Sequence, residues 1–395
     1  MAESNSWPKR LALLSASMLV SFLMAEVAVR LFTKVDPRFY NDADTQQHIS
    51  PESDNRKDNP FGLPMGFHTT RTSTEAKHVG FVTRFNRHGM RDPVDYDFAK
   101  PADTRRVMLL GDSVVFGHVE ESQRLPAALR RAMENRSDGQ KIETPAFSCP
   151  GWDFVSYMVL MQEAVSKFEV DDVVVGVVLN DFTGYEVPIT EDGKIDVASL
   201  ARQPDSTLSL TSAVKAVARH SALLTALAWA SKGFYARKRT LEPTLAKLTK
   251  GQHAFDADVA KLEGGFRWLA KTCRDRKIRC LVMSFPYGPQ LEEAFARQVI
   301  ESWFGKTFSP EVVNDGPQRA LAALAAKTGL EYLDLVPVYR QAGDVATLFF
   351  DTPEGRIDYV HLSARGNEVT AEALAARLSA PPQPLPTAAT DTGAP

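Results

Sequence analysis

Short runs of consecutive apolar residues alternate with longer segments in which apolar side chains recur every three or four positions, mainly between residues 104 and 380. Uninterrupted apolar runs are typical of strands buried on both faces of a parallel sheet, and the longer periodic segments are typical of helices. The expected strands cover 106–110, 142–147, 173–179, 279–285 and 330–336. The expected helices cover 125–135, 155–168, 259–275, 317–328 and 367–378. This alternation predicts a three-layer α/β/α fold with a five-stranded parallel sheet.

The rest of the chain divides by composition into an addition at each end and one insertion. We expect an apolar anchor or signal segment over 1–35, a strand-containing N-terminal extension over 36–103, and the α/β domain over 104–380. A helical insertion is expected over 183–254. The tail over 381–395 is rich in Pro, Ala and Thr, has almost no large apolar residues, and is therefore expected to be disordered.

The insertion contains two apolar runs, over 208–217 and 222–230, neither of which is long enough to span a membrane. Basic and aromatic residues surround the end of the second run: Trp229, Lys232, Phe234, Arg237, Lys238 and Arg239. Three interpretations are open. The insertion forms a helical cap over a site, a surface helix that contacts a membrane, or a plain helix hairpin.

The N-terminal apolar segment has a basic flank. Lys9 and Arg10 precede an uncharged run over 11–25, which ends at Glu26. As one helix, residues 11–32 would extend about 33 Å, enough to cross a bilayer. No A-x-A-like cleavage site precedes Glu26, which favours an uncleaved single-pass inner-membrane anchor over a cleaved signal and a secreted product. The basic flank predicts a cytoplasmic N-terminus, with the remainder in the periplasm or outside the cell.

Two short motifs carry the chemistry. Gly111-Asp112-Ser113 ends the first predicted strand, at the sheet edge where α/β folds bind ligands, and an Asp358-x-x-His361 motif precedes the last predicted helix. A serine hydroxyl becomes nucleophilic when a base removes its proton, and histidine suits that role because its pKa is about 6.5. In a turn or short helical segment, Asp358 would reach back to the His361 ring. Each motif alone is commonly structural, but together they predict acyl transfer through a covalent intermediate.

Four short blocks of this sequence resemble the SGNH hydrolases, also called the GDSL family of esterases and lipases. The blocks are 111–113 with Gly117, Gly151, 179–181, and the D-x-x-H at 358–361. The third block of the family usually reads G-x-N-D, and in this chain Val178 occupies the glycine position. The resemblance covers roughly residues 104–380 and implies the flavodoxin-like strand order 2-1-3-4-5.

The resemblance also implies a role for each matching residue. Ser113 would be the nucleophile, His361 the general base and then the general acid, and Asp358 the residue that orients His361. The oxyanion hole would be formed by the backbone N–H groups of Ser113 and Gly151 and the side-chain amide of Asn180. These roles agree with the chemistry, because one preorganised donor at the developing negative charge is worth about 3–4 kcal/mol.

Several other polar residues have simpler structural interpretations. Asp112 and Asp181 are expected to brace loops through backbone hydrogen bonds. His88 lies in a segment that resembles one preceding the serine block in membrane-anchored bacterial members of the family, and a structural role is favoured over a place in the site. Cys273 and Cys280 lie at the end of a helix and the start of the next strand. In an oxidising compartment a disulfide there is compatible with the sequence.

Composition favours an enzyme and argues against several other classes. The chain has 395 residues, 44% of them hydrophobic, and a net charge of −3. This charge implies no basic face, so nucleic acid is not an expected partner. No phosphate-binding loop, dinucleotide fingerprint, HExxH motif or paired CxxC occurs, so neither a cofactor nor a metal is expected. The oligomeric state is left open.

The predicted function is therefore a serine esterase or acyltransferase. Its expected substrate is an acylated small molecule or an envelope glycan carrying acyl groups such as acetyl, and the extracytoplasmic setting motivates the glycan. Hydrolysis and transfer share the acyl-enzyme on Ser113, so the sequence leaves both open. The alternative is a catalytically silent envelope-assembly or glycan-binding protein with the same fold. The intact Ser113, Asn180, Asp358 and His361 argue against that alternative.

Overall fold

In the computed structural model the chain divides into two compact units, one formed by residues 1–44 and 204–239 and the other by residues 45–203 and 240–395. The residues that the structure describes are 7–32, 74–78, 81–137, 139–182, 186–197, 199, 221, 223, 241–351 and 357–382.

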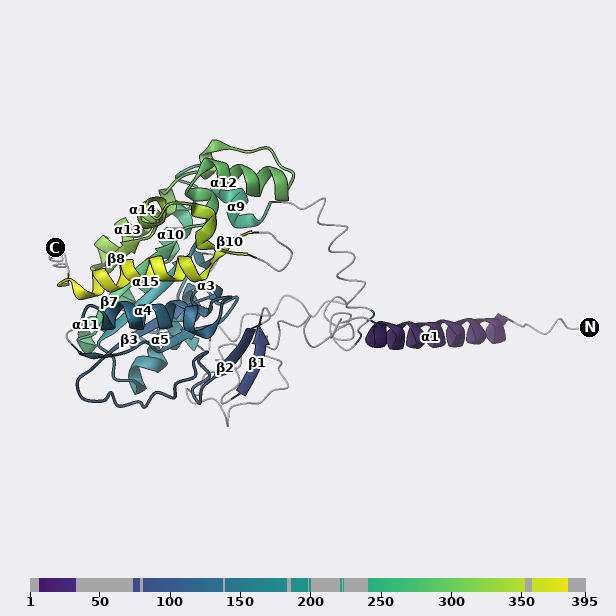
Figure 1. The fold of residues 1–395 in the computed structure, drawn as a ribbon, viewed down its shortest axis with the longest axis horizontal. Coiled ribbons are helices and arrows are strands. Elements are labelled where there is room, and N and C mark those ends of the chain that lie inside the picture. The colour runs from purple at the N-terminus through teal and green to yellow at the C-terminus, as the bar shows by residue number, and fades with distance from the viewer. Residues whose placement is uncertain are drawn as a thin grey trace, which may run out of the picture. The chain divides into compact units, whose positions relative to one another are not determined.

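The described part of the first unit consists mainly of one long helix, α1 (Trp7–Phe32), which is drawn in purple in Figure 1. Over residues 12–31 its mean hydropathy is 2.0 and none of it is buried. Its length and composition fit a membrane-spanning helix and equally a signal sequence, which is the range of outcomes that the sequence predicts.

Two residues of the insertion contact this helix through Glu26. One carboxylate oxygen of Glu26 accepts hydrogen bonds from the Ser221 hydroxyl at 2.7 Å and the Leu223 N–H at 2.8 Å. The other oxygen pairs with Arg30 at 2.7 Å. Apart from Leu223, the predicted apolar runs over 208–217 and 222–230 and the basic cluster that follows lie outside the described residues.

The second unit is built on a parallel sheet with the order β4-β3-β6-β7-β8, in which β5 also pairs with β3. The strands are β3 (Thr104–Gly111), β4 (Lys141–Glu143), β5 (Ala146–Ser148), β6 (Asp172–Val178), β7 (Arg279–Phe285) and β8 (Glu331–Asp334). Since β4 and β5 are the two halves of the predicted second strand, the order is 2-1-3-4-5, and the predicted fold class is confirmed.

The second strand is interrupted at Pro145. Proline has no N–H to donate to a ladder, so continuous pairing is lost at that residue. Its carbonyl oxygen still accepts a hydrogen bond from the N–H of Leu109 at 2.9 Å. The two halves therefore remain beside β3 with a short break between them.

Helices cover both faces of the sheet (Figure 1). On one face α4 (Leu125–Glu134) packs against the closing helix α15 (Ala364–Ser379). On the other face α11 (Glu263–Arg276) lies between α5 (Phe154–Lys167) and α13 (Gly316–Thr328). The helices lie on two faces because every crossover between parallel strands is right-handed and the chain changes direction across the sheet. It first goes from β3 to β4 at one edge, and then from β6 to β8 at the other.

The predicted helix over 259–275 is divided in the structure into α10 (Asp256–Lys261) and α11, with Leu262 between them. The remaining elements are short. The helices among them are α3 (Ser113–Phe116), α9 (Pro243–Leu248), α12 (Glu293–Arg297), α14 (Val336–Gln341) and the π-helical η7 (Gln298–Trp303). The 3₁₀ turns are η3 (Glu121–Gln123), η4 (Leu179–Phe182), η6 (Gly288–Gln290), η8 (Pro310–Val312) and η9 (Val345–Leu348). Two antiparallel hairpins pair β1 (Thr74–His78) with β2 (Phe81–Phe85), and β9 (Phe349–Asp351) with β10 (Ile357–Leu362).

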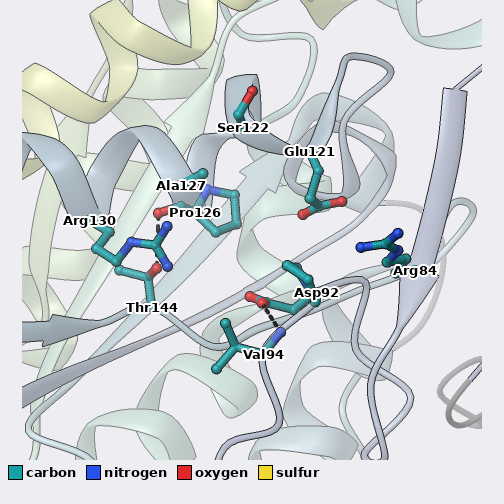
Figure 2. A pocket seen from close by; sticks show the side chains of 10 residues that line it. Arg84, Asp92, Val94, Glu121, Ser122, Pro126, Ala127, Arg130 and Thr144 are labelled. Atoms are coloured by element: carbon teal, nitrogen blue, oxygen red, sulfur yellow. Dashed lines mark hydrogen bonds between the residues drawn. The ribbon is translucent and has the colours of Figure 1, made fainter.

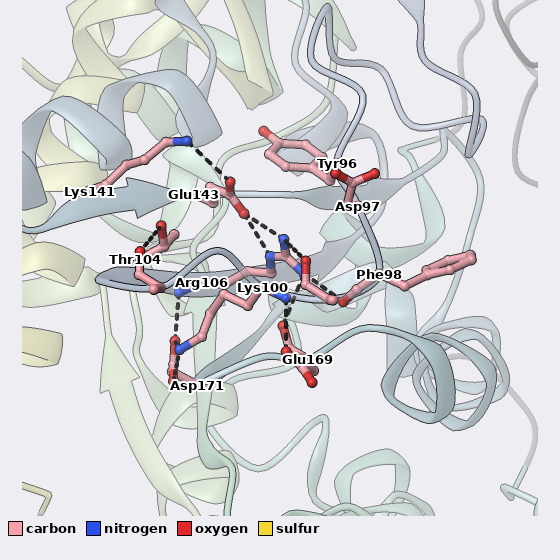
Figure 3. Close-up of polar contacts among 12 residues, drawn as sticks. Tyr96, Asp97, Phe98, Lys100, Thr104, Arg106, Lys141, Glu143, Glu169 and Asp171 are labelled. Atoms are coloured by element: carbon pink, nitrogen blue, oxygen red, sulfur yellow. Dashed lines mark hydrogen bonds and ion pairs between the residues drawn. The ribbon is translucent and has the colours of Figure 1, made fainter.

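The N-terminal extension is attached to the sheet through a buried arginine near the amino end of β3. Figure 3 shows the Arg106 guanidinium between the Glu143 carboxylate, 2.8 Å from Nε, and the carbonyl oxygens of Phe98 and Glu169, at 3.0 and 3.2 Å. Arg106 is fully buried. Because a buried charge is tolerated only when it is paired and hydrogen-bonded, this network fixes the extension at the sheet end opposite Ser113.

His88 has the structural role that the sequence favours. The residue is 4% exposed, and its ring lies between those of Phe98 and Phe168, with centroids 5.1 and 5.0 Å away. Its Nε2 donates to the carbonyl oxygen of Tyr96 at 2.6 Å. Burial lowers the pKa of His88 and is the largest influence on it. The residue therefore packs the extension against the α/β layers.

Cys273 and Cys280 form a disulfide, with 6.2 Å between their Cα atoms. It joins the end of α11 to the start of β7, so the pairing that the sequence allows is present. Cys149 is buried after the end of β5.

Candidate active site

Ser113 is presented by a tight strand-to-helix turn at the carboxyl end of β3, where it is the first residue of α3. Asp112 caps this helix, because its Oδ1 accepts the N–H of Val114 at 2.8 Å. Gly111 makes the turn sterically feasible. A Cβ atom there would lie 2.3 Å from Cγ2 of Val115, a separation that a packed side chain cannot accommodate. Thus the glycine and the aspartate of the motif shape the turn that exposes the serine.

The structure brings Ser113, His361 and Asp358 into one hydrogen-bonded chain. His361 Nε2 lies 2.8 Å from Ser113 Oγ, and His361 Nδ1 lies 2.8 Å from Asp358 Oδ2. An ionised carboxylate can only accept, so Nδ1 carries the proton and Nε2 is left to accept the serine hydroxyl. This is the tautomer that a general base next to a serine requires.

The local backbone at Asp358 differs from the prediction. The sequence suggests a turn or short helical segment, but the residues lie on strand β10, whose pairing with β9 is irregular between Ile357 and Leu362. The bulged strand still contains a local turn, because Asp358 Oδ1 accepts the N–H groups of Val360 and His361 at 2.7 and 2.9 Å. These two bonds bring a carboxylate within reach of a histidine three residues later, despite the extended backbone.

The electrostatics of the site favour an ionised Asp358 beside a basic His361. Burial by itself would lower the pKa of His361, but the charge and hydrogen bond of Asp358, with a contribution from Asp112, raise it above its ordinary value of 6.5. Burial likewise opposes ionisation of Asp358, yet the charge of His361 and the hydrogen bonds that Asp358 accepts hold its pKa below the ordinary value. The pair therefore strengthens the base while keeping its orienting carboxylate charged.

The predicted oxyanion-hole residues follow three neighbouring strands at the same sheet edge. Ser113 follows β3, Gly151 follows β5, and Asn180 lies in η4 directly after β6. Gly151 has φ = 82°, a left-handed conformation that favours glycine, and no heavy atom lies within 4 Å of the position a Cβ would take. The space beside Gly151 is therefore open. The donor roles of these three residues stay a prediction.

Asp181 braces the loop that carries Asn180, as the sequence suggests. Its Oδ2 accepts the Val178 N–H at 2.7 Å and the Tyr157 hydroxyl at 2.9 Å. Burial, followed by the nearby charge of Asp112, raises the pKa of Asp181 well above its ordinary value. This carboxyl group lies in the buried layer beneath the site and fixes the end of β6.

The structure adds one residue that the sequence analysis missed, His118. Its ring stacks on the ring of His361, with 4.0 Å between centroids and 21° between planes. Phe350 lies edge-on to it at 5.8 Å. The available signal was its position, five residues after Ser113 in the loop that leaves α3. Its contact with His361 could not be predicted from a local pattern, because the two residues are 243 positions apart in the sequence.

A cavity of about 390 Å³ lies between the end of the N-terminal extension and the start of α4 (Figure 2). It is lined by Arg84, Asp92, Pro93, Val94, Glu121, Ser122, Pro126, Ala127, Arg130 and Thr144. None of these residues belongs to the triad or to the predicted oxyanion hole. Among the described residues, no group of three His, Cys, Asp or Glu side chains is arranged to hold a metal ion.

No protein-family model matches the chain, and no curated protein matches its sequence. Among solved structures, it is similar to a lipase/acylhydrolase from Enterococcus faecalis, with 13% identity, a TM-score of 0.36, and coverage of 69% of this chain and 95% of the other. A catalytic mutant of an acetylxylan esterase from Geobacillus stearothermophilus gives 12% identity and a TM-score of 0.37, covering 70% and 94%. TesA gives 12% identity and a TM-score of 0.38, covering 70% and 98%.

Proposed function

We propose that this protein is a serine ester hydrolase or acyltransferase of the SGNH type, with Ser113 as the nucleophile. The single observation that carries the proposal is the hydrogen-bonded chain from Ser113 Oγ through His361 to Asp358, with 2.8 Å at each link. A serine next to an oriented imidazole at the carboxyl edge of an α/β sheet is the arrangement that acyl transfer requires.

In the first step His361 Nε2 removes the Ser113 proton while Oγ forms a bond to the acyl carbon. The carbonyl π bond breaks and places negative charge on its oxygen. Asp358 stabilises the imidazolium that forms. When the tetrahedral intermediate collapses, the bond to the leaving oxygen breaks and His361 returns its proton to that oxygen, leaving an acyl group on Ser113.

In the second step a water molecule or an acceptor hydroxyl attacks the acyl carbon, and His361 takes its proton. The bond between the acyl carbon and Ser113 Oγ then breaks, and His361 returns the proton to Oγ, which regenerates the free enzyme. Water gives hydrolysis, whereas a sugar hydroxyl gives transfer. The backbone N–H groups of Ser113 and Gly151 and the amide of Asn180 would stabilise the oxyanion in both steps. Their placement after three adjacent strands supports this role.

The proposed substrate is an ester of a small acyl group, such as acetyl, on an envelope or extracellular glycan.

The proposed location is the inner membrane, with α1 as a single-pass anchor and the second unit outside the cytoplasm. The exposed apolar surface of α1 supports the anchor. If α1 spans the membrane, the protein should remain in the membrane fraction after alkaline carbonate extraction, because apolar burial retains it. A free protein with a new N-terminus near Glu26 would indicate a cleaved signal.

The activity is tested with the full-length chain in detergent micelles and p-nitrophenyl acetate. The wild-type protein should hydrolyse the ester, Ser113→Ala should not, and Ser166→Ala, which changes an exposed serine on α5, should match the wild type. Turnover in Ser113→Ala would overturn the proposal. A wild-type protein that neither turns over esters nor reacts with acylating probes would instead indicate a catalytically silent protein of the same fold.

A further inference from the structure

The loop that leaves the nucleophile helix supports the catalytic histidine. Asp358 and Ser113 hold the two nitrogens of His361, and His118 covers one face of its ring at 4.0 Å. Phe350, on β9, contacts the His118 ring at its edge. The position of the His361 ring therefore depends on how firmly the loop carrying His118 is held.

Two buried arginines hold the backbone of this loop. Arg91 donates to the carbonyl oxygens of Phe116 at 3.0 Å, Gly117 at 2.5 Å and Val119 at 2.8 Å. Arg124 donates to the carbonyl of Phe116 at 2.7 Å and to the carbonyl of Arg91. Residues on both sides of His118 are thus fixed by guanidinium groups. A planar guanidinium suits this task because it presents five donors in a rigid geometry.

The buried arginine pair, Arg91 and Arg124, is an unusual arrangement for a protein interior. The two side chains are 0% and 1% exposed and share one acidic partner, Glu121, at 3.3 and 2.5 Å. Burial, and then the charge of Arg124, lower the pKa of Arg91 to about 9. Burying two like charges is costly, and apolar residues in such positions are often as stabilising. Filling space does not account for the pair, whereas fixing the carbonyls of one loop does.

The N-terminal extension supplies half of this support. Arg91 lies after β2, and its side chain crosses to the loop after α3. Glu121, which pairs with both arginines, also lines the cavity in Figure 2. The extension is therefore connected to the catalytic histidine through Arg91, the loop backbone and His118.

From this chain of contacts we propose that His118 is a positioning residue for His361, that its ring face is the part that acts, and that the buried arginine pair holds it in place. The inference rests on the proposed function. As His361 takes the Ser113 proton it becomes a cation, and an aromatic face stacked on it stabilises that charge. The stack also limits rotation of His361 away from Ser113 between the two proton transfers.

The test uses the full-length protein in detergent and steady-state kinetics with p-nitrophenyl acetate. His118→Leu, which removes the aromatic face, should lower kcat by about tenfold, the size of a partly buried cation–π contact, with little change in KM. His118→Phe keeps the face and should restore most of kcat. His253→Leu is the matched control, because His253 is exposed and its ring pairs with Asp256 at the surface.

The arginine pair is tested by Arg91→Lys, since lysine keeps the charge but cannot reach three carbonyls at once. It should lower kcat as His118→Leu does, and the double variant should be little worse than either single, because both lose the same stack. Arg267→Lys, at an exposed ion pair with Glu263, is the control. Thermal unfolding of each variant separates loss of folding from loss of positioning.

The outcomes are distinct. A wild-type kcat in His118→Leu would overturn the inference, provided that Ser113→Ala is inactive. A Phe variant as poor as the Leu variant would show that a ring nitrogen acts instead of the face. If the losses of the two single variants in kcat multiplied in the double variant, the arginine pair would act independently of His118, and its proposed role in holding His118 would be wrong. Activity in Ser113→Ala would overturn the proposed function itself, independently of His118.

Discussion

The two halves of the triad are held in very different ways. Ser113 begins a helix whose next three residues are buried, and it follows the strand between β5 and β6 in the sheet. Asp358 and His361 lie on β10, which forms a two-stranded sheet with β9 in the described part of the chain and whose side chains are mostly half-buried. The nucleophile is therefore held by a turn anchored in the core, whereas the base lies on a peripheral hairpin.

This difference explains why the base has extra supports. The serine turn follows from the backbone, because Gly111 allows close packing and Asp112 caps α3. The histidine depends on side-chain contacts, with Asp358 at one nitrogen and His118 on one face. A rigid scaffold on one side and a supported hairpin on the other bring both groups to 2.8 Å. Changes on the histidine side should therefore affect catalysis more than folding.

The largest effect is expected from removing either end of the proton-transfer pair. Ser113→Ala and His361→Ala should each lower kcat by about 10⁴-fold or more, and the double variant should be only slightly worse, because the two residues act as one unit. Steady-state kinetics on the four proteins measure this directly. Multiplicative losses in the double variant would show that the two residues do not act together.

A smaller loss is expected for Asp358→Asn, about 10²- to 10⁴-fold in kcat, because the orientation of His361 is weakened while the base itself remains.

The dependence of kcat/KM on pH tests the protonation state of His361. Wild-type kcat/KM should fall as pH drops through the raised pKa of His361, above 6.5. Since the charge of Asp358 raises that pKa, removing it should move the acidic limb to lower pH. A limb that stays in place or moves upward would contradict the assignment.

On the sheet side of the site, where Asn180 follows β6, Asn180→Ala should lower kcat by about 10²- to 10³-fold with a small change in KM, as expected for one oxyanion donor. Asn135→Ala, at the end of α4, is the matched control. The KM-against-kcat comparison distinguishes an oxyanion donor from a residue that only binds substrate. If KM instead rose about 10²- to 10³-fold while kcat stayed unchanged, Asn180 would be assigned to binding of the substrate in its ground state.

The smallest catalytic effect is expected at the disulfide, which lies at the amino end of β7, away from both halves of the triad. Replacing Cys273 and Cys280 by serine should lower the free energy of unfolding by about 2–3 kcal/mol, from the short loop that the bond closes. Activity at 25 °C should be unchanged. Denaturant unfolding and ester hydrolysis measure the two quantities, and a large loss of activity without unfolding would link this edge to the site.

The sequence predicted the fold well wherever a local pattern determines the element. The apolar run at 279–285 is strand β7 at the same residues, and the order of the sheet is as predicted. The break in the second strand differs from the predicted continuous strand, although Pro145 is a local signal for it. The division of the predicted helix at Leu262 also has a local signal, because Gly264 and Gly265 follow almost directly and glycine is a poor helix former.

Some residues of the site were predicted from the sequence and others were not. Ser113, Asp358 and His361 were found from short motifs, and the structure brings them together. The backbone that does so was predicted in part. Asp358 forms the expected local turn with Val360 and His361, but this turn lies within a bulged strand and not in a helical segment. His118 and the buried arginine pair were not predicted, since tertiary contacts between distant residues leave no periodic pattern in the chain.

The central claim is that Ser113 is a nucleophile activated by His361. The most direct measurement is labelling of the full-length protein with a fluorophosphonate, followed by peptide mapping, because such a probe forms a bond only with an activated serine. The account predicts one adduct, on Ser113, whose formation is almost abolished in His361→Ala. An adduct on another residue, or wild-type labelling in His361→Ala, would contradict it.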